Sequence, residues 1–251
     1  MAPLGISLLV FCSLVAGGAL GLLLRRRLPA HHLANDSKDA IKLATGLIGT
    51  MAALLLGLLV ASAKNSYDTD NSEVVQLAAK ITFLDRMLAN FGPQAGDARR
   101  MLHEATQRAI DQMWPPQPSE ATQLDPLATH AEGMYEALHK LAPANEMQTV
   151  MKAKALDAAT DIAQLRWLIL SQKGSSISTP LLVVMVFWLT VVFMSFTLFV
   201  EPNLTVIITL LLCAVSVSGA IFLVLELDEP FGGLLRIPSD AMRMALDHLG
   251  K

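Results

Sequence analysis

Hydrophobic and polar positions alternate along this chain in long blocks. Four blocks of about twenty residues contain no charged side chain, namely residues 4–24, 43–63, 181–200 and 204–225. Because a helix rises about 1.5 Å per residue, each block would make a helix of about 30 Å, the thickness of the hydrocarbon core of a bilayer. The pattern therefore predicts four transmembrane helices.

The polar stretch between the second and third blocks, residues 64–178, has the periodicity of helices. Apolar residues recur at steps of three and four, as at Leu77, Ile81, Leu84 and Leu88, which places them on one helix face. Alternation with a period of two, which is typical of half-buried strands, is absent from the sequence. The stretch is therefore expected to be a helical insert outside the membrane.

Helix breakers divide this insert. Gly92-Pro93 and Pro115-Pro116 predict helix ends, so further helices are expected over about residues 94–114 and 127–141, with a long one after Pro143. Nothing breaks the chain between the second block and the helix that follows it. The two are therefore expected to form a single helix of about 40 residues or more.

Together these elements predict an all-α polytopic membrane protein. The expected parts are a first transmembrane hairpin (1–63), the insert (64–178), a second hairpin (179–226) and a tail (227–251). In the tail a short amphipathic helix is expected after Ser239, whose side chain is the predicted N-cap.

The composition agrees with a protein that lives in lipid. Hydrophobic residues make up 53% of the chain and charged residues only 16%, and the net charge of −3 argues against a nucleic-acid partner. Both cysteines, Cys12 and Cys213, fall inside predicted spans and are interpreted as packing residues. The lipid bilayer is the first expected partner.

A basic cluster predicts the orientation of the first hairpin. Arg25, Arg26 and Arg27 directly follow the first span, and no basic residue precedes it. Because basic loops stay in the cytoplasm, the loop over residues 25–42 is expected there. Both termini and the insert would then lie together on the extracytoplasmic side.

The second span carries a row of small residues. Gly49, Ala53, Gly57 and Ala61 are four residues apart, with Thr50 beside them, and Ser13, Gly17 and Gly21 form a shorter row in the first span. Such rows let helix backbones approach closely in lipid. The row in the second span indicates either packing within the four-helix bundle or the lining of a pore in an oligomer.

The spans carry no ionisable side chain, whereas ion-coupled transporters usually need one in the membrane. The chain also lacks the phosphate-binding, dinucleotide-binding, zinc-protease and nucleophile-elbow motifs. We therefore expect no enzyme, no cofactor and no metal site.

An acidic segment follows the last span. Glu226, Asp228 and Glu229 precede Pro230-Phe231-Gly232. Three carboxylates at the mouth of a helical bundle indicate either a site for a cation or a field at a pore entrance, and the alternative is a solvated helix end.

These residues resemble a known family. The segment 226–232 is similar to the acidic P-F-G motif that follows the last span of bestrophins, and the order of two spans, helical insert and two spans is also similar. More closely, the chain resembles the bacterial bestrophin-like proteins. The matching stretches are residues 45–68, 84–86, 91–93, 166–167, 175–180 and the P-F-G tail.

Bestrophins are pentameric anion channels whose second span lines the pore. The resemblance therefore implies a homo-oligomer, a pentamer by analogy, in the inner membrane of a bacterium. It places Gly49, Thr50, Ala53 and Gly57 at pore-facing positions. It does not imply the calcium site of eukaryotic members, because Gly233-Leu234-Leu235-Arg236 replaces their acidic run. The predicted extracytoplasmic insert also departs from bestrophins, whose insert is cytoplasmic.

Two functions are consistent with these features. The first is an oligomeric ion channel, with anions as the expected permeant species. The second is a non-conducting membrane scaffold or sensor whose helical insert binds a partner.

Overall fold

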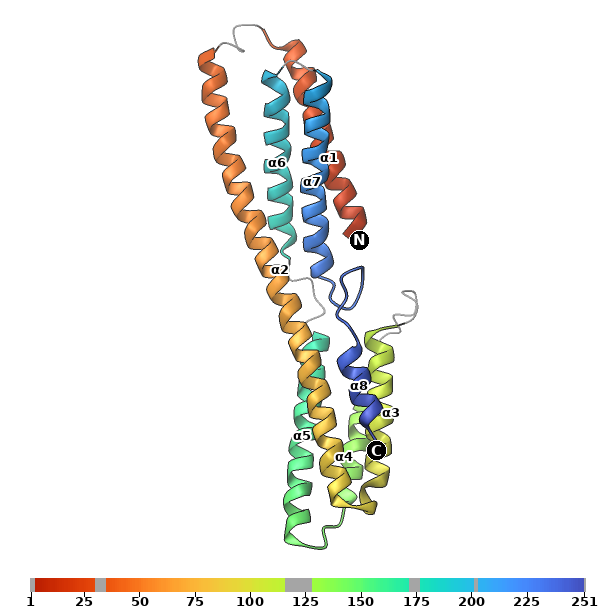
Figure 1. Ribbon diagram of the computed structural model, residues 1–251. Helices are drawn as coiled ribbons and strands as arrows, with labels where there is room; N and C mark the ends of the chain where they lie inside the picture. The colour runs from red at the N-terminus through yellow and green to blue at the C-terminus, as the bar shows by residue number, and fades with distance from the viewer. Residues whose placement is uncertain (1–2, 30–34, 116–127, 172–176, 201–202, 251) are drawn as a thin grey trace. The chain divides into compact units, whose positions relative to one another are not determined.

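The computed structural model describes residues 3–29, 35–115, 128–171, 177–200 and 203–250. Figure 1 shows that helices make up the architecture, and no strand occurs in these ranges. The helices are α1 (Pro3–Arg27), α2 (Asn35–Phe91), the 3-10 turn η2 (Pro93–Ala95), α3 (Gly96–Met113), α4 (Ala128–Lys140), α5 (Glu146–Ser171), α6 (Thr179–Phe199), α7 (Leu204–Leu227) and α8 (Asp240–His248). The predicted all-α fold is confirmed.

Four of these helices are long and apolar enough to cross a membrane: α1, α2, α6 and α7. The expected long helix is also confirmed, since α2 continues without a break for 57 residues. It ends at Gly92, whose φ of 112° is accessible to glycine but strained for other residues, and Pro93 then opens η2.

The predicted loop over residues 25–42 is too long. The helix α1 continues through the arginines to Arg27, and α2 begins at Asn35, so that Lys38 and Lys42 are helical. Charged residues mark where a helix leaves the hydrocarbon core, but they do not end the helix, because most of them favour helical conformation.

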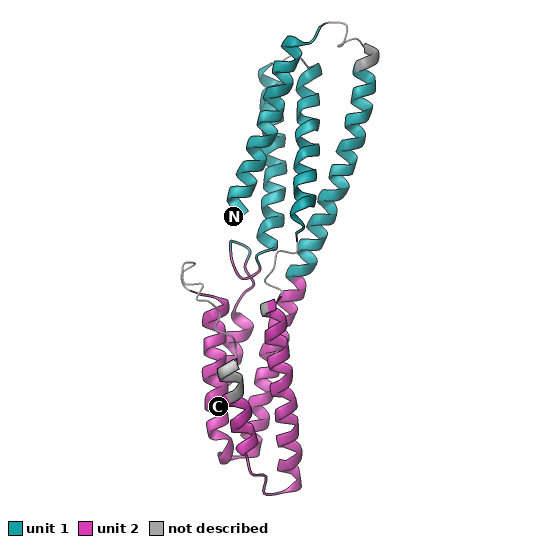
Figure 2. Cartoon of the chain, turned by 180° about the vertical axis from the view of Figure 1, so that it is seen from behind, with its two compact units in different colours: residues 1–67, 175–229, 233–235 teal, residues 68–174, 230–232, 236–251 magenta. Residues whose placement is uncertain are grey.

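The chain divides into two compact units (Figure 2), described separately here. Unit 1 consists of residues 1–67, 175–229 and 233–235, and therefore holds α1, α6, α7 and the first part of α2. Its core is formed by buried apolar side chains, among them Val10, Leu14, Met185, Phe193, Ile221 and Val224.

Close packing of α1 against α6 organises unit 1. A Cβ atom added at Gly17 would lie 2.7 Å from Thr190 Cγ2, and one at Gly21 would overlap Thr197 Oγ1 and the Met194 carbonyl oxygen. The hydroxyls of Ser13 and Thr190 lie 3.1 Å apart. The short row of small residues in the first span is thus a helix-packing surface.

Unit 2 consists of residues 68–174, 230–232 and 236–251. It holds the second part of α2 together with η2, α3, α4, α5 and α8. The apolar face predicted for this part of α2 is confirmed, because Leu77, Ile81, Leu84 and Leu88 are all buried. Leu138 of α4, Ile169 of α5 and Met242 of α8 are buried as well.

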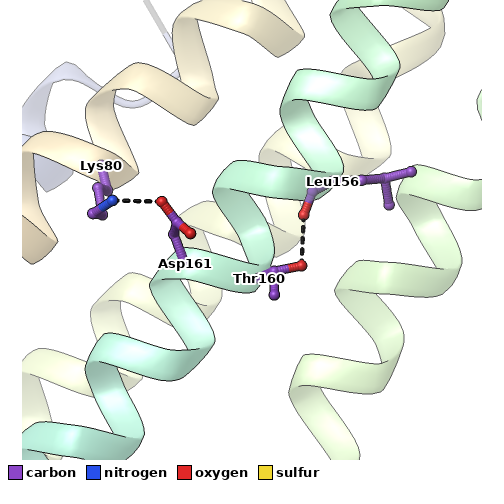
Figure 3. Close-up of polar contacts among 4 residues, drawn as sticks. All are labelled: Lys80, Leu156, Thr160 and Asp161. Carbon is purple, nitrogen blue, oxygen red and sulfur yellow. Dashed lines mark hydrogen bonds and ion pairs between the residues drawn. The ribbon is translucent and has the colours of Figure 1, made fainter.

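Ion pairs add to the apolar core of unit 2. Lys80 Nζ lies 2.6 Å from Asp161 Oδ2 and joins α2 to α5 (Figure 3). Arg99 of α3 binds Asp85 of α2, and both side chains are largely buried. These pairs fix which faces of the helices meet.

The N-cap of the tail helix was predicted at the correct residue, but the predicted capping hydrogen bond from its side chain is not formed. Ser239 is the residue before α8, yet its φ and ψ of −81° and 0° are already helical and its side chain makes no capping hydrogen bond. The Ser239 hydroxyl instead accepts a hydrogen bond from Arg243 Nε at 2.9 Å. Gly250, with φ of 90°, follows the end of the helix in a left-handed conformation.

Candidate functional site

The transmembrane part of α2 presents three different faces. One face is buried in unit 1 and contains Thr45, Ala52, Leu59 and Ala63. These positions are seven or four residues apart, so they lie in one line along a helix of 3.6 residues per turn. The buried face is not the predicted row of small residues.

The row of small residues is mostly exposed. Gly49 is half-buried, whereas Thr50, Ala53, Gly57 and Ala61 are exposed. A Cβ atom added at Gly49 or at Gly57 would find no atom within 4 Å in the part of the chain that the structure describes. The packing that this row was predicted to make within the bundle is therefore not seen, and the face is open to lipid or to another subunit.

The third face of α2 is exposed and bulky. Leu47, Met51, Leu54 and Leu58 lie on it, and Leu54 is 76% exposed. Large aliphatic side chains of this kind are suited to contact with lipid tails. The small and the bulky residues thus lie on neighbouring exposed faces of one helix, which meet along the line of Thr50, Leu54 and Ala61.

A polar contact joins α2 to α6 beside the small face. Thr45 Oγ1 donates a hydrogen bond of 2.9 Å to Ser195 Oγ, and both residues are buried. The contact lies in a crevice of about 370 Å³, lined by Lys42, Thr45, Gly46 and Gly49 of α2 and by Val192, Ser195, Phe196 and Phe199 of α6. Sequence reasoning missed this contact, because it joins residues 150 positions apart.

Basic residues bracket the uncharged stretch of α2. Lys42 precedes it and lies 3.7 Å from Asp39, one turn away. Lys64 follows it, with Nζ 5.2 Å from the centre of the Tyr67 ring. Both lysines are exposed, and no carboxylate lies between them along the helix. A lysine therefore flanks each end of the span, and the first of the two lies beside a carboxylate.

The three arginines after α1 differ in their surroundings. Arg26 and Arg27 are exposed, whereas Arg25 is half-buried and donates a hydrogen bond to the carbonyl oxygen of Val200, directly after α6. A cation at a helix C-terminus is favoured by the helix dipole. Arg25 thus has a structural role in unit 1 besides its predicted role in topology.

The acidic segment after α7 begins with a buried carboxylate. Glu226 is 4% exposed, and its Oε2 accepts a hydrogen bond of 2.5 Å from the Leu234 amide. Asp228 is half-buried and Glu229 is exposed. No group of three potential metal ligands occurs among the described residues, and the cation site stays a prediction. Glu226 stabilises the turn that contains Gly233.

The P-F-G residues that follow pack within unit 2. The ring of Phe231 contacts that of Trp114 edge to face, with centroids 5.8 Å apart and an interplanar angle of 74°. Trp114 Nε1 donates a 2.8 Å hydrogen bond to the Ile237 carbonyl oxygen, and the Ile237 amide donates one of 2.7 Å to Pro230. Gly232 is exposed, and the left-handed backbone belongs to Gly233, with φ of 64°.

Comparison with known proteins identifies one family. The family model described as the bestrophin-like domain matches residues 12–242. No curated protein and no solved structure matches the chain significantly. The match includes α2, α6 and α7 in full and α1 from residue 12 onward, and it extends over parts of both units.

Proposed function

Because the chain belongs to the bestrophin-like domain family, we propose that it is the subunit of an oligomeric ion channel for anions. The family and the four apolar helices make it a membrane protein of the bestrophin type. Channel activity and assembly into an oligomer are what we propose beyond this. In the proposed channel, copies of α2 surround the pore with their small faces.

The observation that carries this proposal is the uncovered small face of α2. Within the described chain no helix packs on Gly49 or Gly57, although glycine rows in membrane helices usually serve close helix contacts. A face of glycine, alanine and threonine leaves room for an ion, and its hydroxyl and backbone dipoles offer weak binding that permits release.

The charges at the ends of the span favour anions. Lys42 and Lys64 flank the uncharged stretch, Lys42 beside Asp39, and rings of these lysines around an axis would place ammonium groups at each mouth that can bind anions.

The direct test is current recording from purified protein in planar bilayers under a potassium chloride gradient. The proposal expects unitary currents whose reversal potential approaches the chloride equilibrium potential. Replacing both lysines, Lys42→Gln and Lys64→Gln, should shift the reversal potential away from the chloride equilibrium potential and toward that of potassium. A sealed bilayer at all voltages, with intact oligomers, would contradict the proposal.

A matched pair of cysteine variants tests which face lines the pore. In a background with Cys12→Ala and Cys213→Ala, Ala53→Cys lies on the small face and Leu54→Cys on the bulky face. A charged, membrane-impermeant thiol reagent should modify Ala53→Cys and reduce the current, while Leu54→Cys remains unmodified. Equal reactivity of the two positions would show that α2 does not line a pore in this way.

A second candidate function is a non-conducting scaffold or sensor. It is favoured by large apolar side chains exposed on the insert, since Phe83 is 58%, Met147 65% and Trp167 65% exposed. Crosslinking of full-length protein in its native membrane, followed by mass spectrometry, distinguishes the two. Crosslinks from these side chains to a different protein favour the scaffold, and crosslinks only between copies of the chain favour the channel.

A further inference from the structure

Arg166 on α5 carries a charge that unit 2 does not balance. Its Nε atom is buried and has no hydrogen-bond partner within the ranges that the structure describes. Burial lowers the pKa of Arg166, which means that the side chain has lost hydration without gaining a compensating contact. A guanidinium remains charged at any ordinary pH, so an unpaired one in such a place is costly.

Two carboxylates of unit 2, one on α2 and one on α5, are occupied by other partners. Asp85 of α2 binds Arg99 through both oxygens, at 2.7 and 3.0 Å. Asp161, five positions before Arg166, binds Lys80 and points toward α2, as Figure 3 shows. These ion pairs leave the Arg166 fork, formed by Nε–H and one Nη–H, available for a ligand.

Arg166 is one of the residues that line a cavity of about 100 Å³. Four helices contribute to its wall, with Leu84 of α2, Leu102 of α3, Met134 of α4 and Ile162 of α5 as apolar lining. Apart from Arg166, Tyr135 is the other lining residue whose side chain ends in a strongly polar group. An apolar cavity with one fixed positive charge selects a ligand with one anionic end and an apolar body.

We propose that this cavity binds a carboxylate with a short hydrocarbon chain. A turn of the Arg166 side chain toward the cavity lets the two carboxylate oxygens accept hydrogen bonds from Nε–H and Nη–H in the bidentate geometry that guanidinium favours. The hydrocarbon chain lies against Leu102 and Met134. An engineered cavity of about 150 Å³ holds benzene, so the smaller volume here suits a ligand of about four carbons.

A halide fits this cavity less well than a carboxylate. It would contact the guanidinium on one side, but its other side would face hydrocarbon without hydrogen bonds. The proposal concerns the insert alone and does not depend on ion conduction, so a failure of the channel experiment leaves it standing.

Calorimetry on the full-length protein in detergent tests the proposal with butyrate as the probe. Butyrate is too short to partition strongly into the micelle. We expect one butyrate bound per chain, at least tenfold weaker binding in Arg166→Gln, and unchanged binding in Arg100→Gln, an exposed arginine of α3. Butyramide, which has nearly the same shape but no charge, should not bind.

A second variant keeps the test decisive if Arg166→Gln does not fold. Ala163→Leu fills the cavity from α5 while leaving Arg166 in place, and it should weaken butyrate binding to a similar degree. Equal butyrate affinity in the unmodified protein and in Ala163→Leu would overturn the proposal. Binding of butyramide as tightly as butyrate, or displacement of butyrate by an equal concentration of chloride, would also overturn it.

Discussion

Arg99 and Asp85 form a two-pronged ion pair between α3 and α2, with Nε 2.7 Å from Oδ1 and Nη2 3.0 Å from Oδ2. The carboxylate is almost fully buried, at 5% exposure, and the guanidinium is 21% exposed. The planar fork of arginine matches both carboxylate oxygens, which gives the pair its geometry. The pair therefore fixes the register of α3 on α2, and it differs from Arg166, whose fork has no such partner.

Removing Arg99 should destabilise unit 2 more than removing Asp85. Arg99→Ala leaves a carboxylate buried without its counter-ion, which costs about 3 to 5 kcal/mol. Asp85→Ala leaves an arginine that can turn its partly exposed head into water, so the expected loss is about 1 to 3 kcal/mol. Thermal unfolding of the two variants in detergent, followed by circular dichroism, shows which variant is less stable.

The matched control is Arg100→Ala on the same helix. Arg100 lies 3.2 Å from Asp97, but both side chains are well exposed, so that loss of this pair should change the free energy of unfolding by less than about 1 kcal/mol. A change as large as that of Arg99→Ala would show that exposure does not govern these pairs.

The same pair predicts a flat response to alkaline pH. The hydrogen bonds to Asp85 raise the pKa of Arg99 above its usual value. A raised pKa on a basic group gives stability that is fully present below the unfolded-state pKa and is lost only as the pH rises through the folded-state value. The difference in unfolding free energy between the unmodified protein and Arg99→Ala should therefore stay constant from about pH 7 to about pH 10. A steady decline over that range would contradict the assignment.

The same substitution should destabilise the protein at one glycine of the membrane helices and leave it stable at another. Gly21→Ala places a methyl group onto Thr197 and the Met194 carbonyl, so α1 must move away from α6 and the protein should lose about 1 to 3 kcal/mol. Gly57→Ala meets no atom within 4 Å in the described chain and should leave the fold intact. Thermal stability and particle size in detergent report both effects.

A larger side chain separates assembly from conduction at Gly57. Gly57→Leu should leave the oligomer folded and of unchanged size but reduce the current, because in the proposed channel the added bulk narrows the pore. Dissociation into folded subunits would show that the small face is a subunit contact and not the pore lining.

The positions of the helices were predictable because they depend on local pattern. The four uncharged blocks, the apolar face of Leu77 to Leu88 and the break at Gly92-Pro93 each lie within one segment, and each predicted element is present. The partner of each helix was not predictable in this way. The rows at Gly17 and Gly49 have the same spacing in the sequence. In α1, however, Gly17 faces Thr190 and Gly21 faces Met194 and Thr197 of α6, whereas a Cβ atom at Gly49 would meet no atom within 4 Å in the described chain.

The same distinction explains the P-F-G tail. The motif indicated a turn of functional or structural importance. The contact between Glu226 and Gly233 could not be predicted from the sequence, because it depends on the path of the backbone through that turn. Trp114 donates a hydrogen bond to Ile237, which lies 123 positions away. Nothing in the sequence around Trp114 predicted this contact, apart from its place at a helix end. Likewise Arg166 was visible only as part of a family motif, because its burial depends on four helices coming together.

Gly233 should tolerate no side chain. Its φ of 64° strains any other residue, and an added Cβ would overlap the carboxylate of Glu226. Gly233→Ala is expected to lower the free energy of unfolding by about 1 to 3 kcal/mol, whereas Gly232→Ala, at an exposed position without positive φ, should lower it by less than about 1 kcal/mol. Equal melting temperatures for the two variants would show that the turn does not depend on Gly233.

The arginines after α1 predict the orientation of the whole chain. We expect the loop after Arg27 in the cytoplasm and the C-terminus outside, so that an alkaline phosphatase fused after Lys251 is active in a bacterial host while a fluorescent protein fused there is dark. Arg26→Gln with Arg27→Gln removes two exposed charges and should give a mixed population, because the remaining Arg25 is held by the Val200 carbonyl. As a control, Arg236→Gln with Arg243→Gln, on the opposite side, should leave the phosphatase active. A bright fluorescent fusion and an inactive phosphatase on the unmodified chain would reverse the predicted orientation and place the insert in the cytoplasm.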